Sequence, residues 1–360
     1  MSQRASETVF FPCSLPASIK GLIFVRSFDA AVSRTQIVLC PLQDPNRVPL
    51  CGTLAYLEPE MPPPDSPSSE PHIFTLTGNL LAERTLEFSA WKPGKTQRAE
   101  RESFQVGGKG INVSKMLNRL SAPNTALCFA GGAPGAECEA WLRERGFTFQ
   151  AFVSLAPTRS GTVVRGGALK ETTFLGPDAA PDPTAVRACA KFLDAQKDGQ
   201  VLALCGSFPG WSNGSFDPLR SALERWMRRG ILTADTYGPP LAWLVRRPLA
   251  LVKINADELR VLASDLEHLP PGMAVERWVV TDGAAAVQIR DRDGKLRRLS
   301  PPKIREVSPT GSGDVLFACV LHALFHRKRP LREAVSFALP YAAANAAHPG
   351  VAEFPHPFRR

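Results

Sequence analysis

From residue 72 onward, short apolar runs alternate with stretches of helical periodicity. The apolar runs predict strands at IFTLTGN (73–79), TALCFAGG (125–132), QVLALCGS (200–207), ILTADT (231–236), PLALVKIN (248–255) and ERWVVTDG (276–283). The periodic stretches predict helices at NVSKMLNRLSA (112–122), GAECEAWLRERG (135–146), AVRACAKFLDAQKDG (185–199) and FDPLRSALERWMRRG (216–230). Strands separated by helices indicate an α/β fold in which helices cover both faces of a mostly parallel sheet.

Two segments, at about residues 84–106 and 161–177, interrupt this alternation because they contain strand and turn residues without helical periodicity. We expect them to form a small antiparallel lid beside the main sheet. Such a lid has exposed strand edges, which can pair with a second copy of the chain. The pattern therefore also allows a homodimer formed through the lid.

Residues 1–71 lack the alternation of strands and helices seen in the rest of the chain. They end in the proline-, serine- and acid-rich sequence EPEMPPPDSPSSEP (58–71). This composition is typical of a flexible linker. We therefore expect a poorly ordered N-terminal extension at residues 1–71, followed by one large domain at residues 72–360. Upstream sequence translated from a wrongly chosen start is an alternative that the chain alone leaves open.

The composition is that of a globular protein with a sizeable core, with 44% hydrophobic and 21% charged residues. No uninterrupted apolar run of about 18 residues predicts a membrane helix, and the N-terminus lacks the pattern of a signal peptide. The eight cysteines form no Cys-x-x-Cys pair, so neither a zinc site nor a disulfide framework is indicated. We expect reduced thiols in a cytoplasmic protein.

The net charge of +9 comes from short basic clusters such as RWMRRG, RDRDGKLRR and HRKRPLR. These clusters lack interleaved aromatic residues and match no nucleic-acid-binding motif, so we expect no nucleic-acid partner. Most of them are explained as solvated helix faces, and they are compatible with attraction of anionic substrates.

Residues 308–325, SPTGSGDVLFACVLHALF, place one carboxylate, Asp314, between a glycine-rich turn and an apolar run. The run from Val315 to Phe325 predicts a helix that is buried on all sides. Asp314 could simply cap this helix. Alternatively, backbone N–H groups of the turn could bind a phosphate while Asp314 takes the proton of an attacking hydroxyl. These residues alone leave both interpretations open.

A second glycine-rich stretch, FQVGGKGINVSKMLNRL (104–120), has Gly107, Gly108 and Gly110 around Lys109. Glycines let the backbone approach a ligand closely, and Asn112 is expected to open the following helix. The stretch matches neither the Walker A pattern nor Gly-x-Gly-x-x-Gly, so it indicates neither a P-loop nor a dinucleotide site.

Six short motifs between residue 73 and the C-terminus together resemble the ribokinase/PfkB family of carbohydrate kinases. They are TLTGNLLAERT (75–85), GGKGIN (107–112), CGSFPG (205–210), KINADEL (253–259), VVTDGAAAV (279–287) and SPTGSGD (308–314). They look most similar to the sugar-phosphate branch, which includes 1-phosphofructokinase and tagatose-6-phosphate kinase. The resemblance implies a ribokinase-like three-layer sandwich, with a mostly parallel central sheet and a small β lid.

The resemblance also implies which residues transfer the phosphoryl group. Asp314 would be the base for a primary hydroxyl of the sugar. The backbone N–H groups of the anion hole would come from Gly311, Ser312 and Gly313. The implied lining of the ATP site is Lys253, Thr281 and Gly283, and the implied organisers of Mg²⁺, acting through water, are Asn255 and Glu258. Mg²⁺ with ATP suits this set because the ion keeps several waters and needs few carboxylates.

On the sugar side, the resemblance implies contacts to hydroxyls from Glu83, Gly108 and Asn112. It implies contacts to a phosphate already on the substrate from Lys95, Arg159 and Ser207, of which arginine suits bidentate phosphate binding best. The sequence departs from the family here: Glu83 stands in place of Asp, Ser308 in place of Asn or Asp, and Thr173 where some relatives carry a basic residue.

The resemblance therefore implies an ATP-dependent kinase that phosphorylates a primary hydroxyl of a ketohexose phosphate, of the fructose 1-phosphate or tagatose 6-phosphate type. Two alternatives share the fold: a kinase of an unphosphorylated sugar or nucleoside, and a non-catalytic sugar-binding regulator. Lys95 and Arg159 argue against the first, and the intact GSGD sequence argues against the second. A serine hydrolase is excluded because CGSFPG does not fit Gly-x-Ser-x-Gly.

Overall fold

The structure, a computed structural model, describes residues 70–166 and 169–357. The predicted extension at residues 1–71 lies outside the described residues except for its last two positions. In the described part of the chain, the five cysteines are buried and free, at positions Cys128, Cys138, Cys189, Cys205 and Cys319. No helix of that part is long and apolar enough to cross a membrane.

The main sheet, within the described residues, has nine strands in the order β13-β12-β11-β10-β9-β8-β1-β4-β5. The seven strands β11, β10, β9, β8, β1, β4 and β5 run parallel to one another. At one edge, β12 pairs antiparallel with β11, and β13 pairs antiparallel with β12. Their bounds are β1 Ile73–Thr77, β4 Asn124–Ala130, β5 Phe149–Val153, β8 Val201–Gly206, β9 Ile231–Thr236, β10 Leu251–Asn255, β11 Trp278–Thr281, β12 Val287–Arg290 and β13 Leu296–Leu299.

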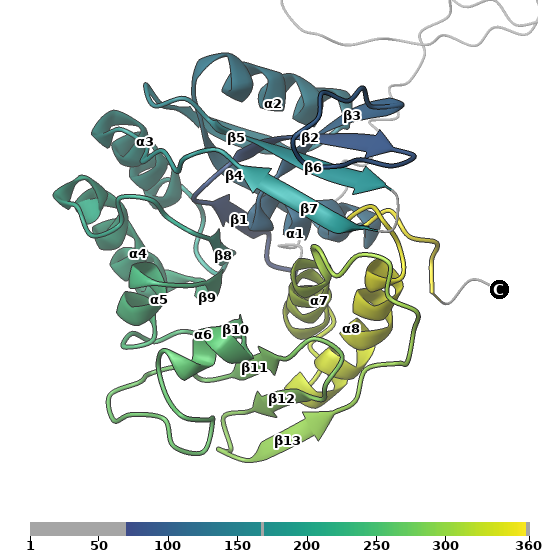
Figure 1. The fold of residues 1–360 in the computed structure, drawn as a ribbon. Coiled ribbons are helices and arrows are strands. Elements are labelled where there is room, and N and C mark those ends of the chain that lie inside the picture. Colours follow the sequence, from purple (N-terminus) through teal and green to yellow (C-terminus); the bar gives the residue numbers. More distant parts are fainter. Residues whose placement is uncertain (1–69, 167–168, 358–360) are drawn as a thin grey trace, which may run out of the picture. The chain divides into compact units, whose positions relative to one another are not determined.

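Helices cover both faces of this sheet, as the alternation of strands and helices predicted (Figure 1). The larger helices are α1 Lys109–Arg119, α2 Gly132–Glu144, α3 Pro183–Asp194, α4 Asp217–Arg229, α7 Ser312–Leu321 and α8 Leu331–Ala346. Short helices are α5 Pro239–Leu244, α6 Ala256–Arg260, a 3₁₀ turn at Gly214–Phe216 and a π turn at His322–His326.

Alternate residues of the central strands pack into two separate cores. On β8, Val201 and Ala203 face the core built with α1, α7 and α8, whereas Leu202 and Leu204 face the core built with α3, α4 and α5. A strand that buries both faces has a nearly continuous apolar sequence, which is why these strands could be recognised as apolar runs. The three-layer α/β architecture predicted from the sequence is confirmed.

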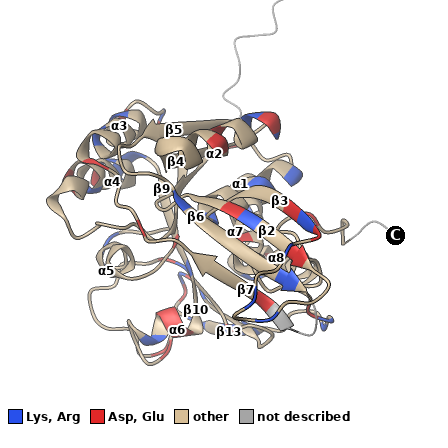
Figure 2. Cartoon of the chain, turned by 45° about the horizontal axis from the view of Figure 1, so that its top comes forward, with Lys and Arg blue, Asp and Glu red and all other residues tan. Residues whose placement is uncertain are grey.

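The two segments that lacked helical periodicity form a separate four-stranded lid in the order β3-β2-β6-β7 (Figure 2). Its strands are β2 Leu81–Phe88, β3 Arg101–Gly107, β6 Arg159–Gly166 and β7 Leu169–Leu175. The expectation of an antiparallel lid was wrong for its central pair, because β2 and β6 pair in parallel. The hairpins β2-β3 and β6-β7 are each antiparallel. Between the two hairpins the chain passes through α1, β4, α2 and β5. This long connection allows β6 to pair with β2 in the parallel direction.

Helix α7 is apolar around its whole circumference, and every residue from Asp314 to Leu321 is buried. This confirms the prediction of a fully buried helix, which continues as the π turn to His326. The N-termini of α1 and α7 follow glycine turns on the side where the parallel strands end. In open α/β sheets, ligands bind at the carboxyl ends of the strands, so this edge is where a site is expected.

Candidate active site

The turn into α7 requires glycine at position 311, and Gly313 leaves the helix start without a side chain. Gly311 adopts φ 73°, and a Cβ there would lie 2.5 Å from Cγ1 of Val351. A Cβ on Gly313 would lie 2.5 Å from Nζ of Lys253. The backbone at the start of α7 is therefore bare on the side that faces the lysine, which leaves room for an anion against its N–H groups.

Asn345, on α8, anchors this turn. Its fully buried Nδ2 donates to the carbonyl of Thr310 at 2.9 Å and to Oγ of Ser312 at 3.0 Å. Its Oδ1 accepts from the backbone N–H of Ala352 at 2.8 Å. Sequence reasoning did not identify Asn345, whose one signal is an amide inside the otherwise alanine-rich stretch YAAANAAH.

Asp314 is not the helix cap. The N-cap position belongs to Gly311, and no side chain caps the helix. Instead, Oδ2 of the buried Asp314 accepts a 2.7 Å hydrogen bond from Nδ2 of Asn112. Helix α1 begins at Lys109 rather than at the expected Asn112, which leaves the Asn112 side chain free to point at Asp314 from the first turn.

The carboxyl of Asp314 has a pKa suited to a base that works near neutrality. Burial and the nearby charge of Asp235 raise its pKa to about 6, while Lys109, Lys253 and the hydrogen bond from Asn112 oppose the rise. The group is therefore mostly ionised at pH 7, yet its pKa is close enough to accept a proton readily.

Asp235, at the end of β9, is fully buried between two ammonium groups. Oδ1 lies 2.6 Å from Nζ of Lys109, and Oδ2 lies 2.9 Å from Nζ of Lys253. Burial alone would raise the pKa of Asp235, but the two lysines outweigh burial and lower it. Sequence reasoning missed Asp235, whose signal is a lone carboxylate in the strand ILTADT.

The residues implied for the nucleotide side lie within or just after β10 and β11. Lys253 is buried within β10, and Thr281 ends β11 with its hydroxyl 3.4 Å from the carbonyl of Ile254. Gly283 follows with φ 51° and nothing within 4 Å of a built Cβ, so its surroundings are open.

Asn255 and Glu258 form a capping box at the start of α6. Oδ1 of Asn255 accepts from the N–H of Glu258, and Oε2 of Glu258 accepts from the N–H of Asn255, both at 2.8 Å. The other carboxylate oxygen, Oε1 of Glu258, lies 3.7 Å from Nζ of Lys109. No group of three or more His, Cys, Asp or Glu that could hold a metal occurs among the described residues. The side chains of Asn255 and Glu258 offer few oxygen donors, and some of these already accept hydrogen bonds. Such a set suits Mg²⁺, which keeps several waters and is held mainly by nucleotide phosphates.

Among the residues implied for sugar binding, Gly108 adopts φ 120°, and a Cβ there would lie 2.7 Å from Cγ2 of Thr77. The hydroxyl of Thr77, at the end of β1, is buried and has no hydrogen-bond partner among the described residues. Thr77 is a further candidate that sequence reasoning did not single out. Gly108 directly precedes α1, and Asn112 lies in the first turn of that helix.

Glu83 lies on lid strand β2 and accepts a hydrogen bond from Gln105 of β3. Burial raises the pKa of its carboxyl, with Glu171 adding to the rise. Glu171, on β7, pairs with Arg165 of β6 at 2.6 Å and accepts from the hydroxyl of Thr310 at 3.3 Å. The lid therefore touches the residue immediately before the glycine turn of α7.

Arg159, at the start of β6, lies in a polar cluster near Ser207. Its NH1 pairs with Oδ1 of Asp178 at 2.8 Å. The same oxygen accepts from Nδ2 of Asn79 at 2.8 Å, and that amide also donates to Oγ of Ser207 at 3.0 Å. The structure thus brings Arg159 and Ser207 together, as expected, but it adds a carboxylate that the sequence did not predict.

Lys95 is not part of this cluster. It lies on the exposed loop between β2 and β3, where the described residues show no hydrogen bond or ion pair for it. Ser308 is buried just ahead of the glycine turn, and its hydroxyl has no partner within the described chain. Thr173, on β7, is exposed.

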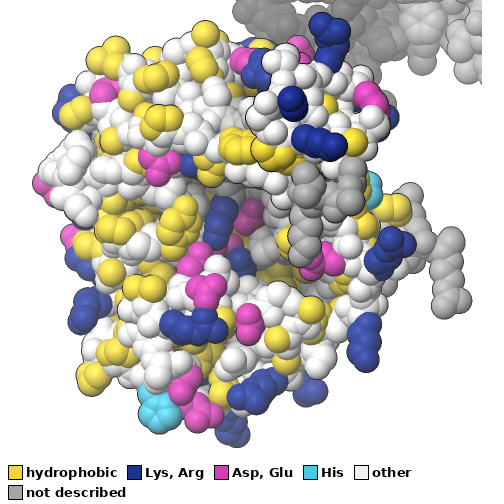
Figure 3. Space-filling view, viewed as in Figure 1, with side chains coloured by type: hydrophobic (Ala, Val, Ile, Leu, Met, Phe, Trp, Pro, Cys, Tyr) yellow, Lys and Arg dark blue, Asp and Glu magenta, His cyan; other side chains and the backbone are white. Residues whose placement is uncertain are grey.

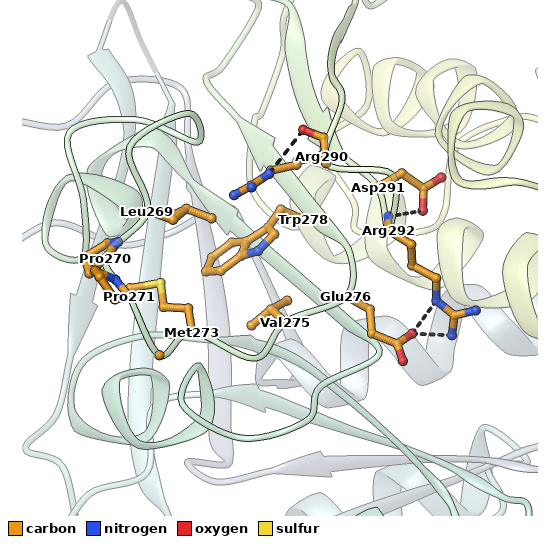
Figure 4. Close-up of a pocket in the computed structure, with 12 residues that line it drawn as sticks. Leu269, Pro270, Pro271, Met273, Val275, Glu276, Trp278, Arg290, Asp291 and Arg292 are labelled. Carbon is orange, nitrogen blue, oxygen red and sulfur yellow. Dashed lines mark hydrogen bonds and ion pairs between the residues drawn. The ribbon is translucent and has the colours of Figure 1, made fainter.

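The face shown in Figure 3 is hollowed between the lid and the lower part of the domain, and acidic and basic side chains lie side by side in the hollow. A separate cavity of about 450 Å³ lies elsewhere, lined by residues such as Met273, Trp278 and Arg290 (Figure 4). Trp278 begins β11, whereas Thr281 ends it, so this cavity is at the opposite end of the strand from the candidate site.

Comparison with known proteins agrees with the motifs. A protein-family model, described as pfkB family carbohydrate kinase, matches residues 78–358 of this chain. The 1-phosphofructokinase of Borreliella burgdorferi is 26% identical over 295 residues, which are 78% of this chain and 94% of that protein. The tagatose-6-phosphate kinase of Staphylococcus epidermidis is 25% identical over 273 residues, which are 71% of this chain and 86% of that protein.

Solved structures share the fold. Phosphofructokinase-2 from Escherichia coli, in complex with substrates and products, superposes with a TM-score of 0.70 at 22% identity and covers 79% of this chain and 95% of its own. Ribokinase from Thermotoga maritima gives a TM-score of 0.60 at 18% identity and covers 79% of this chain and 96% of its own.

Proposed function

Because this chain belongs to the pfkB family of carbohydrate kinases, we propose that it transfers the γ-phosphoryl group of ATP to a primary hydroxyl of a ketohexose phosphate. The fructose 1-phosphate and tagatose 6-phosphate types are the acceptors proposed, since similar proteins bear the names 1-phosphofructokinase and tagatose-6-phosphate kinase.

One observation carries the proposal. The buried carboxyl of Asp314, with a pKa raised to about 6, lies at the start of α7, where glycines leave the backbone N–H groups uncovered. Asp314 would accept the proton of the attacking hydroxyl while a bond forms between that oxygen and the γ-phosphorus. The N–H groups of Gly311, Ser312 and Gly313 would hold the charge on the transferring group. Such preorganised donors are typically worth about 3–4 kcal/mol each.

The nucleotide would lie along the ends of β10 and β11, beside Lys253, Thr281 and Gly283. Asn255 and Glu258 would hold Mg²⁺ through water. When bound, Mg²⁺ would neutralise charge on the ATP phosphates.

On the acceptor side, Glu83, Gly108 and Asn112 would bind sugar hydroxyls. Arg159 and Ser207 would bind the phosphate that the substrate already carries, since both lie in one polar cluster. Lys95 would join them only if its exposed loop moves toward the cluster.

A second candidate function follows from Asp178. This carboxylate already pairs with Arg159, and a substrate phosphate would have to displace it against like-charge repulsion. An unphosphorylated sugar would instead find a carboxylate and an arginine ready to bind its hydroxyls. The pairing of Arg159 with Asp178 thus favours the alternative of a neutral acceptor.

The deciding experiment is ATP turnover, with Mg²⁺ present, against matched pairs of phosphorylated and free ketohexoses, with nucleosides included. We expect the highest kcat/KM for a ketohexose phosphate. A higher value for the free sugar of the same pair would establish the second candidate. An absence of turnover with every acceptor would contradict both.

We also propose that the enzyme forms a homodimer through the lid. Edge strand β7 exposes Phe174 and Leu175 by more than half, and both are apolar. Sedimentation of the wild-type chain and of a Phe174→Glu, Leu175→Glu double variant tests this. The wild-type chain should sediment as a dimer and the double variant as a monomer.

A further inference from the structure

A cavity of about 270 Å³ lies where α1 and α7 end, away from the glycine turns at which both helices begin. Helix α1 ends at Arg119, and α7 continues through the π turn to His326. Helix α8 lines the cavity from a third side. The side chains that matter most here are Arg119, His322, Arg327, Arg329, Phe337 and Tyr341.

Three guanidinium groups line this cavity without a carboxylate to balance them. In the described part of the chain, Arg119, Arg327 and Arg329 form no ion pair, and the lining contains no Asp or Glu. Glu70 lies 4.0 Å from Nδ1 of His326, but neither of these two residues lines the cavity. Such a concentration of positive charge around a hollow attracts an anion.

His322 holds the guanidinium of Arg327 in place. Burial, and then the neighbouring His326, lowers the pKa of His322 to about 4, so its ring is neutral at pH 7. Nε2 of His322 accepts a hydrogen bond from Nε of Arg327 at 3.2 Å. The two terminal nitrogens of Arg327 donate to no described residue, and they can therefore donate as a pair to an anion.

The backbone around the cavity adopts unfavourable conformations. Ser121, Lys328 and Ala352 are the non-glycine residues with positive φ in the described chain, at 54°, 53° and 54°. Ser121 lines the cavity, Lys328 lies between two of its arginines, and Ala352 accepts a hydrogen bond from the third. Residues with a side chain rarely adopt this conformation, and such residues gather at functional sites.

Each arginine has an ordinary explanation when it is taken alone. Arg119 lies in the last turn of α1, where a cation offsets the helix dipole, and Arg327 and Arg329 are exposed and hydrated. This explanation does not require the three to meet, yet they surround one hollow beside two aromatic rings. The rings of Phe337 and Tyr341 have centres 5.1 Å apart, and they give the hollow an apolar wall.

Hydrogen bonds connect the cavity to the glycine turn of α7. The guanidinium of Arg119 donates to the carbonyls of Ala352 at 2.6 Å and Phe354 at 2.8 Å. The N–H of Ala352 donates to Oδ1 of Asn345, whose Nδ2 anchors the glycine turn. A ligand that draws Arg119 away from these carbonyls would loosen the segment that Asn345 holds, and with it the turn.

We propose that this cavity is a second ligand site, at which a small organic phosphate binds and lowers kcat. The phosphate group would contact the three arginines, and the organic part would lie against Phe337. The cavity is smaller than the roughly 300–1,000 Å³ of sites for drug-sized ligands, which suits a small molecule. Binding is independent of the kinase function proposed above, whereas the effect on kcat rests on it.

The first test titrates the full chain by calorimetry with a ketohexose phosphate, with AMP and with inorganic phosphate. An Arg327→Ala, Arg329→Ala double variant should bind one molecule fewer per chain of at least one of the two organic phosphates. A Lys328→Ala, Arg332→Ala variant is the matched control, because it removes the same charge from the same segment at residues that do not line the cavity. It should bind as the wild type does.

Equal numbers of bound organic phosphates in the wild type and the Arg327→Ala, Arg329→Ala variant would overturn the proposal. Loss of the same site in the control would also overturn it, since charge alone would then explain binding. Inorganic phosphate should bind this site about tenfold more weakly, because it has no part to pack against Phe337. Equal or tighter binding of inorganic phosphate would overturn the assignment to an organic phosphate.

The second test measures turnover at saturating ATP and acceptor while the concentration of the bound organic phosphate is raised. The kcat of the wild type and of the control should fall about fivefold or more, a size common for coupling between distinct sites, and that of the Arg327→Ala, Arg329→Ala variant should not fall. Competition at the active site would instead raise KM in all three chains. An unchanged wild-type kcat would overturn the coupling. If the wild type phosphorylates no acceptor, the kinase function fails, while the binding test still decides whether the site exists.

Discussion

Asn112 donates a 2.7 Å hydrogen bond to Oδ2 of Asp314, although 202 residues separate the two in the chain. The bond joins the glycine turn that opens α1 to the glycine turn that opens α7. It therefore fixes the carboxylate that would act as base against the loop that would bind the sugar. A hydrogen bond to a charged, buried group is worth about 1.5–3 kcal/mol, so the two turns support each other.

Asp314→Asn should lower turnover by about 10²–10⁴-fold, the usual contribution of a general base. The variant should also be more stable than the wild type at pH 8, because the raised pKa means that folding disfavours the ionised form. The gain is about 3 kcal/mol at most. It should shrink as the pH falls below the folded pKa of about 6, and it should vanish only below the ordinary carboxyl pKa of about 4, where Asp314 is neutral in both the folded and the unfolded chain. Thermal melting at pH 8 and pH 5, beside steady-state kinetics, checks both parts. Retention of more than half of the activity would show that Asp314 is no base.

The activity of the wild-type enzyme should fall as the pH drops through about 6, because protonation of Asp314 removes the proton acceptor. Above that value the base is ionised and the rate should level off. The profile should be measured with a free and a phosphorylated sugar, so that titration of a substrate phosphate is told apart from titration of Asp314. A rate that is flat from pH 5 to pH 8 with both sugars would contradict the assignment.

Arg159 and Asp178 together test which acceptor the site prefers. Arg159→Ala should raise KM for a sugar phosphate by about 30- to 150-fold, since a charge-assisted contact is worth about 2–3 kcal/mol, with less effect on KM for ATP. Lys95→Ala should do less, because the side chain is exposed and lies apart from the cluster.

Asp178→Asn is the complementary change, since it removes the carboxylate that now pairs with Arg159. If the acceptor carries a phosphate, this variant should bind it more tightly and KM should fall. If the acceptor is a neutral sugar, KM should rise. Equal effects of Arg159→Ala on phosphorylated and free sugars would show that no phosphate binds there.

Glu83→Asp should improve kcat/KM for an ordinary ketohexose phosphate, because it restores the shorter carboxylate of the family at that position. Misplacement of a substrate by about 1 Å can cost about 10²-fold in rate. Gln105 is the partner of Glu83 across the lid, and Gln105→Ala serves as a control for loss of lid packing alone. Lower activity of Glu83→Asp on every sugar would mean that the longer side chain fits a different acceptor.

A chain that begins at Glu70 should be soluble and as active as the full chain. Residues 71 and 72 must stay, since the carbonyl of Pro71 lies 2.8 Å from Nε2 of His326 and the N–H of His72 donates to Gln200. Expression, melting temperature and kcat of the two chains make the comparison. Insoluble product, or loss of activity, would show that the first 69 residues contribute to the folded domain.

The parts of the site that lie on one continuous motif could be predicted from the sequence. The turn at Gly311 and the buried helix behind it have a composition that allows few other structures, and the glycines around Lys109 mark a close backbone approach. Local sequence also indicated the lid, because both lid segments lack helical periodicity.

Residues that act through packing could not be predicted. Asp235 sits in an ordinary buried strand, and it gains its role only because β9 pairs between β8 and β10, which brings Lys109 and Lys253 to it. Asp178 meets Arg159 only because the chain turns back after β7 toward the start of β6. The parallel pairing of β2 with β6 was missed for the same reason, since pairing between distant segments leaves no mark in either one.

The complete burial of α7 bears on how new activities can be engineered into this molecule. A substitution on that helix disturbs packed core on every side. Few substitutions on α7 should therefore be tolerated. Glu83 and Arg159, which we propose face the acceptor, lie instead on lid strands outside the main sheet. Directed evolution should therefore find altered sugar preference in libraries confined to the four lid strands, while libraries on α7 yield mostly unfolded protein.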